Sequence, residues 1–227
     1  MKRLVLFVEG AGDVAAVPVL VRKLLTEKDA WDCVHLDDSP FEIKGLHNFT
    51  GRRAQNWPNK LQAAARRKNF GGVLLLLDGD TKHYRDAPFC AATAARALAD
   101  AARKAGAGEV FSVSVVFACR EYESWLLAGA GSLAGQPPPD RRPGIPAGAP
   151  VPEGDFEESH RNAKKWFKET LPNGYNPPID QKPLTQLVDL EEIRARKMRS
   201  FQRLESALDQ IIDAFRGGTH IVSPCEG

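Results

Sequence analysis

The sequence predicts an α/β protein with a parallel four-stranded sheet, helices on both faces of that sheet and a mostly helical C-terminal extension. In the first half of the chain, short apolar runs alternate with longer segments of helical character, the pattern that gives parallel strands joined by crossover helices. The runs are continuously apolar, as strands buried on both faces are. At 227 residues, the chain is long enough for one such domain with an extension.

The elements follow in the order strand, helix, strand, helix, strand, helix, strand. Residues 59–70 are expected to form a helix that ends at Gly71-Gly72, because glycine is common just after a helix. The other expected helices are 14–27 and 90–108, and the expected strands are 3–8, 31–36, 72–80 and 110–118.

The C-terminal third has a different composition. Residues 136–152 contain seven prolines and two glycines, a composition that no regular element accommodates. We therefore expect an α/β domain over residues 1–135, a Pro/Gly-rich loop or linker over 136–155, and a helical extension over 156–227 that packs on the first domain. Within the extension, apolar residues recur at helical spacing, namely Phe201, Leu204, Leu208, Ile211 and Phe215.

Bulk properties narrow the classes of protein. A formal net charge of +2 does not by itself indicate a nucleic-acid binder. The four cysteines form no C-x-x-C pair, which disfavours a structural zinc site and a disulfide framework. The chain starts without a signal-peptide core, and no apolar run approaches membrane-spanning length. We expect a cytoplasmic protein that does not enter the membrane.

Acidic residues gather where two of the expected strands end. Glu9 and Asp13 flank the turn after the first strand, and Asp78 and Asp80 end the third. The carboxyl ends of parallel strands meet at one edge of the sheet, and residues two apart in an extended segment point to the same side. Four carboxylates would repel one another, and a hard cation such as Mg²⁺ or Mn²⁺ relieves that conflict. We therefore expect a metal site there.

Two other interpretations compete with the metal site. From Gly10 the sequence also matches G-x-G-x-x-A, the dinucleotide-binding fingerprint, although Glu9 at the turn would repel a pyrophosphate. Alternatively, Asp13 is an ordinary helix cap and Asp78-Gly79-Asp80 an ordinary polar turn. The coincidence of acids at two strand ends favours the metal.

A third acidic corner follows the fourth strand, in the segment "REYESW". Glu121 or Glu123 would reach the metal from here, and Glu121 is favoured because it lies nearer the strand end. The alternative is an exposed first helical turn, where acids favour the helix dipole.

These motifs resemble the Toprim domain, the metal-dependent catalytic module of topoisomerases, bacterial primases and several small nucleases. That family has a glutamate after its first strand and an Asp-x-Asp after its third, which match Glu9, Asp78 and Asp80. The form "EGAGD" is similar to the OLD-type nucleases, in which the aspartate corresponding to Asp13 helps hold metal. Over nearly its whole length the chain looks like small bacterial Toprim-like proteins of the DUF4276 type, through "VEGAGD", "LLLLDGD", "CREYESWLLAG", "AKKWFKE" and "PPIDQKPLTQLVDL".

The resemblance implies a Mg²⁺-dependent endonuclease that acts on DNA or RNA, with Glu9 as a metal ligand or as the general base. OLD-type nucleases also use a lysine beyond their acidic motifs, and Lys164, Lys165 and Lys182 are the candidates. Similar proteins act with a separate ATPase in defence against phages, and this chain lacks a phosphate-binding G-x-x-x-x-G-K-[ST] loop. The alternatives are a non-catalytic Toprim-fold binding module and a metal-dependent phosphatase or nucleotidyl transferase.

Overall fold

A parallel sheet forms the centre of the computed structural model, which describes residues 1–84, 87–140, 142–157 and 162–224. The sheet has the order β2-β1-β4-β7-β8, and β3 also pairs with β1. All of these pairs are parallel. The strands are β1 (Lys2–Val8), β2 (Val34–Leu36), β3 (Phe41–Glu42), β4 (Phe70–Asp78), β7 (Ser112–Ala118) and β8 (Val222–Ser223).

The predicted α/β class, with its parallel sheet covered by helices, is confirmed. The four expected strands correspond to β1, β2, β4 and β7, and the two-residue strands β3 and β8 extend the sheet. The order of helices and strands also matches the prediction in the first half of the chain. Outside the sheet, β5 (His83–Tyr84) and β6 (Ala87–Pro88) form a small antiparallel pair.

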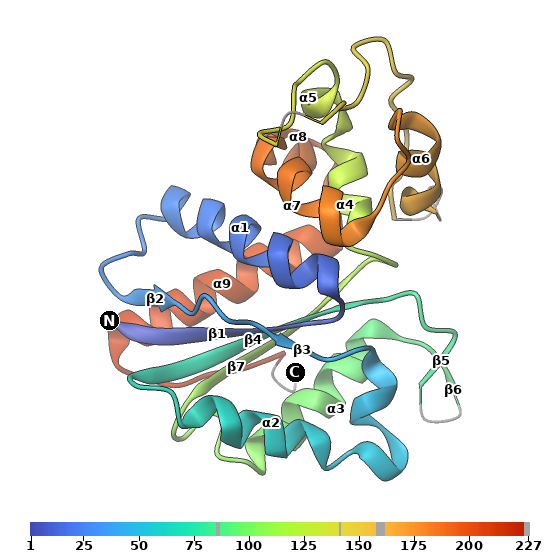
Figure 1. The fold of residues 1–227 in the computed structure, drawn as a ribbon. Coiled ribbons are helices and arrows are strands. Elements are labelled where there is room, and N and C mark those ends of the chain that lie inside the picture. The colour runs from blue at the N-terminus through green and yellow to red at the C-terminus, as the bar shows by residue number, and fades with distance from the viewer. Residues whose placement is uncertain (85–86, 141, 158–161, 225–227) are drawn as a thin grey trace.

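Helices cover both faces of the sheet (Figure 1). On one face, Val73, Leu75 and Leu77 of β4 join a buried core with α2 (Asn56–Ala65) and α3 (Ala91–Arg103). On the other face, Leu74 and Leu76 join a core with α1 (Ala11–Glu27) and α9 (Arg199–Gly217). Both faces of β4 are therefore buried, which explains its continuous apolar run.

The prediction that the helix over residues 59–70 ends at Gly71-Gly72 is wrong. The observed helix α2 stops at Ala65, and both glycines lie inside β4. A Cβ on Gly72 would lie 2.7 Å from the carbonyl oxygen of Ser112 on the neighbouring strand. Close packing within the sheet, rather than helix termination, accounts for glycine at this position.

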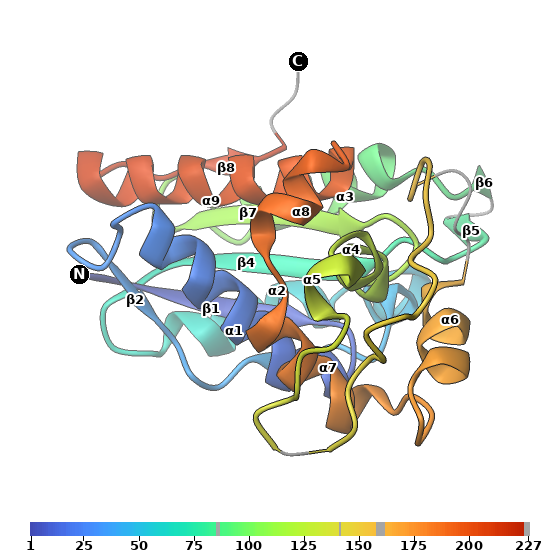
Figure 2. The same cartoon turned by 90° about the horizontal axis from the view of Figure 1, so that it is seen from above.

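The remaining helices gather over the carboxyl ends of the strands, as the views in Figures 1 and 2 show. They are α4 (Glu123–Ala128), α5 (Ala130–Leu133), α6 (Ala163–Thr170), α7 (Pro177–Leu187) and α8 (Leu190–Ala195). The short 3₁₀ helices Leu46–Phe49 and Gly51–Arg53 precede α2.

Helix α7 lies along α1, and a side chain ties the two together. Lys23 of α1 donates hydrogen bonds to the carbonyl oxygens of Thr185 and Gln186, both at 3.4 Å, and to that of Val188. These carbonyl groups lie at the C-terminal end of α7, where a cation is favourable. The C-terminal region is thereby fixed against the helix that follows β1.

The described part of the proline-rich segment 136–155 contains no helix or strand. It is nevertheless anchored, since Ile145 is buried and its carbonyl oxygen accepts a hydrogen bond from Gly135. Among the described residues, no helix has both the length and the apolar character needed to cross a membrane.

Candidate functional site

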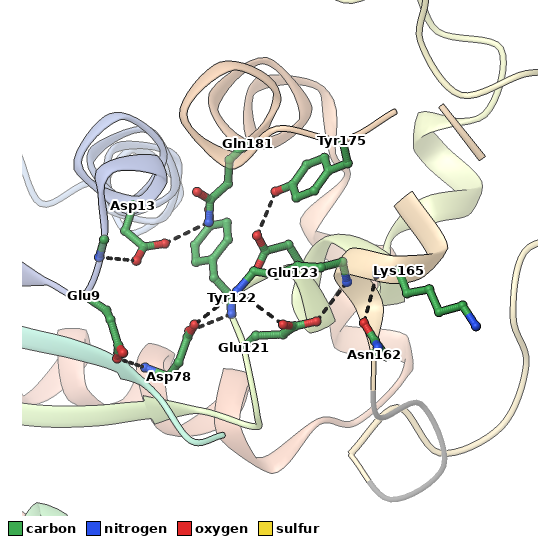
Figure 3. Close-up of polar contacts among 12 residues, drawn as sticks. Glu9, Asp13, Asp78, Glu121, Tyr122, Glu123, Asn162, Lys165, Tyr175 and Gln181 are labelled. Carbon is green, nitrogen blue, oxygen red and sulfur yellow. Dashed lines mark hydrogen bonds and ion pairs between the residues drawn. The ribbon is translucent and has the colours of Figure 1, made fainter. Parts of the chain in front are cut away.

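The carboxyl ends of β1, β4 and β7 bring three acidic segments to one edge of the sheet. Val8 pairs with Leu76, and Asp78 pairs with Ala118, so the three strands end almost level with one another. Because the strands are parallel, the residues that follow them leave the sheet on the same side. Figure 3 shows the acids that meet there.

Glu9 and Asp78 are linked directly. One carboxylate oxygen of Glu9, Oε2, accepts a hydrogen bond from the backbone N–H of Asp78 at 2.8 Å. The Asp78 carboxylate in turn accepts one from the backbone N–H of Tyr122 at 2.9 Å. These two bonds connect the turn after β1, the end of β4 and the segment after β7 (Figure 3). The sequence-based expectation that the first and third strand ends meet is met for this pair.

Asp13 lies in the first turn of α1 and is held on both oxygens. Its Oδ2 accepts from the backbone N–H of Gly10 at 2.9 Å, and its Oδ1 accepts from the Gln181 side chain at 2.8 Å. The helix begins at Ala11 with Gly10 as its N-cap, so the interpretation of Asp13 as the N-cap residue is wrong. It is the third helical residue and bonds back to the cap, as an acid in a capping box does.

Gly12 is needed for helix packing. A Cβ at this position would lie 2.0 Å from Oε1 of Gln181 and 2.9 Å from Cβ of Pro177. The glycine that suggested a dinucleotide fingerprint therefore allows α7 to approach α1, and the approach brings Gln181 to Asp13.

Both glutamates of the third acidic corner reach the site. Oε1 of Glu121 accepts from the backbone N–H of Lys164 at 2.9 Å. Glu123 is 1% exposed, and its Oε1 accepts from the hydroxyl of Tyr175 at 2.9 Å. The sequence favoured Glu121 over Glu123, whereas the folded chain brings the two together.

A single lysine ammonium lies among three of these acids. Nζ of Lys164 is 3.2 Å from Glu121, 3.4 Å from Glu123 and 3.6 Å from Asp78, measured to their carboxylate oxygens. Lys164 is in the first turn of α6, whose start is capped by the Asn162 side chain accepting from the backbone N–H of Lys165 at 3.0 Å. The cap fixes the turn from which Lys164 extends.

The charged form of several acids of the site is destabilised. The pKa values of four acids are raised, namely those of Glu9, Asp13, Asp78 and Glu123. Burial is the largest cause in each case, and neighbouring carboxylates raise the pKa further. The pKa of Asp78 is raised well above its ordinary value, and that of Glu123 is raised to about 6. The lysine does not neutralise the cluster, because it is one cation among several acids.

Lys164 itself is held in the charged form. Burial alone would lower the pKa of its ammonium, but the carboxylates of Glu123, Asp78 and Glu121 together raise it above its ordinary value. The ammonium is therefore positively charged at neutral pH.

Three other candidates lie outside this contact network. Asp80 and Lys182 are exposed, and among the described residues no hydrogen bond or ion pair joins either to the acids. Asp80 is near enough for its charge to raise the pKa of Glu9. Strand β4 ends at Asp78, so the strand alternation that would align Asp80 with it does not continue. Lys165 pairs with Glu169 at 3.7 Å on the surface of α6.

Several polar groups of the site come from the C-terminal region or from the segment after β7. The hydroxyl of Tyr122 lies 2.9 Å from that of Thr185, and Tyr175 and Gln181 bind Glu123 and Asp13. The sequence carried one signal for them. Gln181 and Thr185 are polar residues one helical turn apart, so they lie on the same side of the helix. The structure shows that both are buried.

The donor chemistry of the site suits a hard divalent cation, although no set of ligands is preformed. Within the described ranges, no three His, Cys, Asp or Glu side chains are arranged to hold a metal ion, since Lys164 lies between Asp78, Glu121 and Glu123. All the acids offer carboxylate oxygens, the ligand type that Mg²⁺ and Mn²⁺ prefer. Oε1 of Glu9 accepts no hydrogen bond from the described residues, and the raised pKa values mark a cluster that a cation would stabilise.

Comparisons with known proteins give a family. A family model described as "Domain of unknown function (DUF4276)" matches residues 8–209, a range that includes every acid of the site and Lys164. No curated protein and no solved structure has significant similarity to the chain. The protein is therefore a member of the DUF4276 family.

Proposed function

We propose that this protein is a Mg²⁺- or Mn²⁺-dependent phosphodiester hydrolase that acts as an endonuclease on DNA or RNA. One observation carries the proposal: acids from three strand ends converge with raised pKa values, and Lys164 is the one cation seen to pair with them in the described chain. Buried acids left with excess negative charge are typical of catalytic and metal sites. Resemblance of the acidic motifs to Toprim and OLD-type nucleases supports the reaction class.

The acids divide between holding the ion and handling protons. Asp78, Glu121 and Glu123 would hold the cation together with Asp13, after Lys164 has moved away from them. When bound, Mg²⁺ supplies charge stabilisation at the phosphoryl oxygens and lowers the pKa of a water molecule. Glu9 is fixed through Oε2 and keeps Oε1 available. Its raised pKa suits it to accept the proton of the attacking water, and the same oxygen could instead share the ion.

Lys164 is the proposed electrostatic partner of the substrate. Its ammonium stays charged, and the carboxylates that hold it would be shared with the divalent ion. The released ammonium would then bind a non-bridging phosphate oxygen and stabilise the charge that develops during hydrolysis.

The biological setting follows from the resemblance. We propose a separate ATPase subunit as partner and a role in defence against phages, because similar Toprim-type modules act in that way. The free cysteines Cys33, Cys90 and Cys119 fit the reducing cytoplasm, which is the compartment that we propose.

The test is hydrolysis by the purified protein with Mg²⁺, with Mn²⁺ or with EDTA. Plasmid, single-stranded DNA, transfer RNA and a chromogenic phosphate ester serve as substrates. We expect metal-dependent cleavage of a nucleic acid that is lost in Glu9→Gln and in Asp78→Asn. The matched control is Asp38→Asn, because Asp38 is exposed and pairs only with Arg22 among the described residues. Cleavage that persists in both site variants would overturn the proposal, and hydrolysis of the ester alone would favour a phosphatase.

A further inference from the structure

A cavity of about 610 Å³ lies beside the acids, at the end of β7. It is lined by the first turns of α3 and α9, by Val115, Phe117 and Ala118 of β7, and by Gly79. Gly79 stands between Asp78 and Asp80, and Arg120, which also lines the cavity, precedes Glu121. Two residues of the lining are thus sequence neighbours of the proposed catalytic acids, and the volume of the cavity is in the usual range for a small-molecule site.

The charged side chains of the lining are mostly basic. Four arginines line the cavity against one acid among the described residues, Glu157. Glu157 is already engaged, since it accepts from the backbone N–H of Ser200 at 2.7 Å and pairs with Arg199 at 3.5 Å. The excess positive charge favours an anionic ligand; the arginines are Arg96, Arg120, Arg199 and Arg203.

Arg120 has a buried hydrogen-bond donor that lacks an acceptor within the described part of the chain. Its Nε is buried and has no hydrogen-bond partner among the described residues. Its backbone φ is +67°, in the left-handed region that residues other than glycine rarely adopt. A buried donor without an acceptor destabilises the protein, and an anionic oxygen bound in the cavity would accept its hydrogen bond.

Helix α3 offers further donors. Cys90 is its N-cap and gives no side-chain cap, and the first turn contains no acid. Ala91 and Ala92 of this turn line the cavity, so the N-terminal end of a 13-residue helix borders it, and the positive end of the helix dipole favours an anion there. The start of α9 differs, because Glu157 already caps it.

The cavity also has an aromatic and apolar surface. The rings of Phe89 and Phe117 are in edge-to-face contact with 5.4 Å between their centroids, and both line the cavity beside Ala95 and Val115. An inorganic phosphate would use only the basic groups. A nucleoside phosphate would use both parts, because bases stack on aromatic side chains and arginines bind phosphate.

We infer that this cavity binds one nucleoside phosphate unit of a single-stranded nucleic acid, with the base against Phe89 and Phe117 and the phosphate at the arginines and the α3 terminus. A base must be unpaired to enter such a cavity, which selects single strands or frayed ends. Because Gly79 and Arg120 of the lining adjoin Asp78 and Glu121 in the sequence, this unit would lie near the bond to be hydrolysed under the proposed function.

The test measures binding in EDTA, so that it does not depend on hydrolysis. A fluorescein-labelled single-stranded octanucleotide is titrated with the full-length protein and followed by anisotropy. Two variants at exposed lining positions of α3 challenge the cavity: Ala92→Phe fills it and Arg96→Glu reverses a charge. The matched controls are Ala63→Phe on α2 and Arg103→Glu at the far end of α3, neither of which lines the cavity.

We expect both cavity variants to weaken binding at least tenfold and both controls to stay within twofold of wild type. The octanucleotide should also protect the exposed Cys90, which lines the cavity, from alkylation. Absence of binding by the wild type, or wild-type binding by Ala92→Phe and Arg96→Glu, would overturn the inference.

Competitors identify the source of the ligand. Adenosine monophosphate should displace the octanucleotide at least tenfold more weakly than an unlabelled octanucleotide does, and a blunt duplex should compete poorly. Equal competition by the monophosphate would overturn the assignment to a strand. Binding at this cavity without metal-dependent cleavage would leave the inference standing and count against the proposed function alone.

Discussion

Two aspartates at strand ends of the same sheet have opposite surroundings. Asp37, directly after β2, is 5% exposed and pairs with Arg3 at 2.8 Å and with Arg67. Asp78, at the end of β4, has a side chain 13% exposed, and among the described residues it pairs with one cation, Lys164, at 3.6 Å. Although burial alone would raise the pKa of Asp37, hydrogen bonds from the backbone of Ser39 and from both arginines hold it below its ordinary value. The pKa of Asp78 is raised well above its ordinary value.

The difference separates an acid that is paired within the fold from an acid that we propose binds a metal ion. Each buried charge needs a partner within the protein, and Asp37 has two arginines for one carboxylate. Around Asp78 the ratio is inverted, because Glu121, Glu123 and Asp78 share one ammonium. This excess negative charge does not stabilise the fold, but it would favour the binding of a divalent cation.

The largest expected contrast between the two aspartates is in hydrolysis. Asp78→Asn removes a proposed ligand charge and should lower metal-dependent cleavage about 10³-fold. Asp37→Asn, assayed well below its unfolding temperature, should stay within about threefold of wild type, because Asp37 contacts none of the acids and a change away from the site leaves transition-state stabilisation intact. Initial cleavage rates under saturating Mg²⁺ measure both effects. Equal losses in the two variants would remove the distinction.

Stability should show the reverse contrast. Asp37→Asn leaves Arg3 and Arg67 without their carboxylate and should lower the free energy of unfolding by about 3 kcal/mol at neutral pH. Asp78→Asn relieves repulsion and keeps an oxygen for the Tyr122 backbone N–H, so it should not destabilise the metal-free protein. Urea unfolding in EDTA checks both. A larger loss for Asp78→Asn would contradict the assignment of the two roles.

A smaller effect is expected in the pH dependence of stability. The pKa of Glu123 is about 6 in the folded chain against an ordinary value of 4.5. Between these values the folded state binds more protons, so this group lowers stability by about 2 kcal/mol as pH rises through them. Glu123→Gln keeps an acceptor for Tyr175 and removes the titration. In EDTA, the unfolding free energy of the variant relative to wild type should rise by about that amount between pH 4 and pH 7.5. A flat difference would contradict burial of an ionisable Glu123.

The sequence was sufficient for the parts of the site that depend on strand ends. Glu9 and Asp78 follow apolar runs whose parallel pairing brings their ends together, and local pattern alone carries that inference. Asp80 shows its limit, because strand alternation applies only as far as β4 continues, and β4 ends at Asp78. The two-residue strands β3 and β8 are too short to produce an alternating pattern.

The rest depends on long-range packing. Gln181 reaches Asp13 because α7 lies against α1 at Gly12, and Tyr175 reaches Glu123 from the same region. Helical periodicity predicts which face of a helix is buried but not against which element it is buried. The motif resemblance indicated Lys164 as one candidate among three, and only the folded chain distinguishes it from Lys165 and Lys182.

Binding of Mn²⁺ is the most direct test of the central claim, that the acid cluster holds a divalent cation. Free Mn²⁺ is measured by electron paramagnetic resonance as protein is added, with Mg²⁺ as competitor. Wild type and Asp37→Asn should bind the ion at millimolar or lower concentrations, and Mg²⁺ should displace it. Asp78→Asn and Glu121→Gln should weaken binding at least tenfold, because each removes a proposed carboxylate ligand. Wild-type protein that leaves the Mn²⁺ signal unchanged, or site variants that bind as wild type does, would contradict the account.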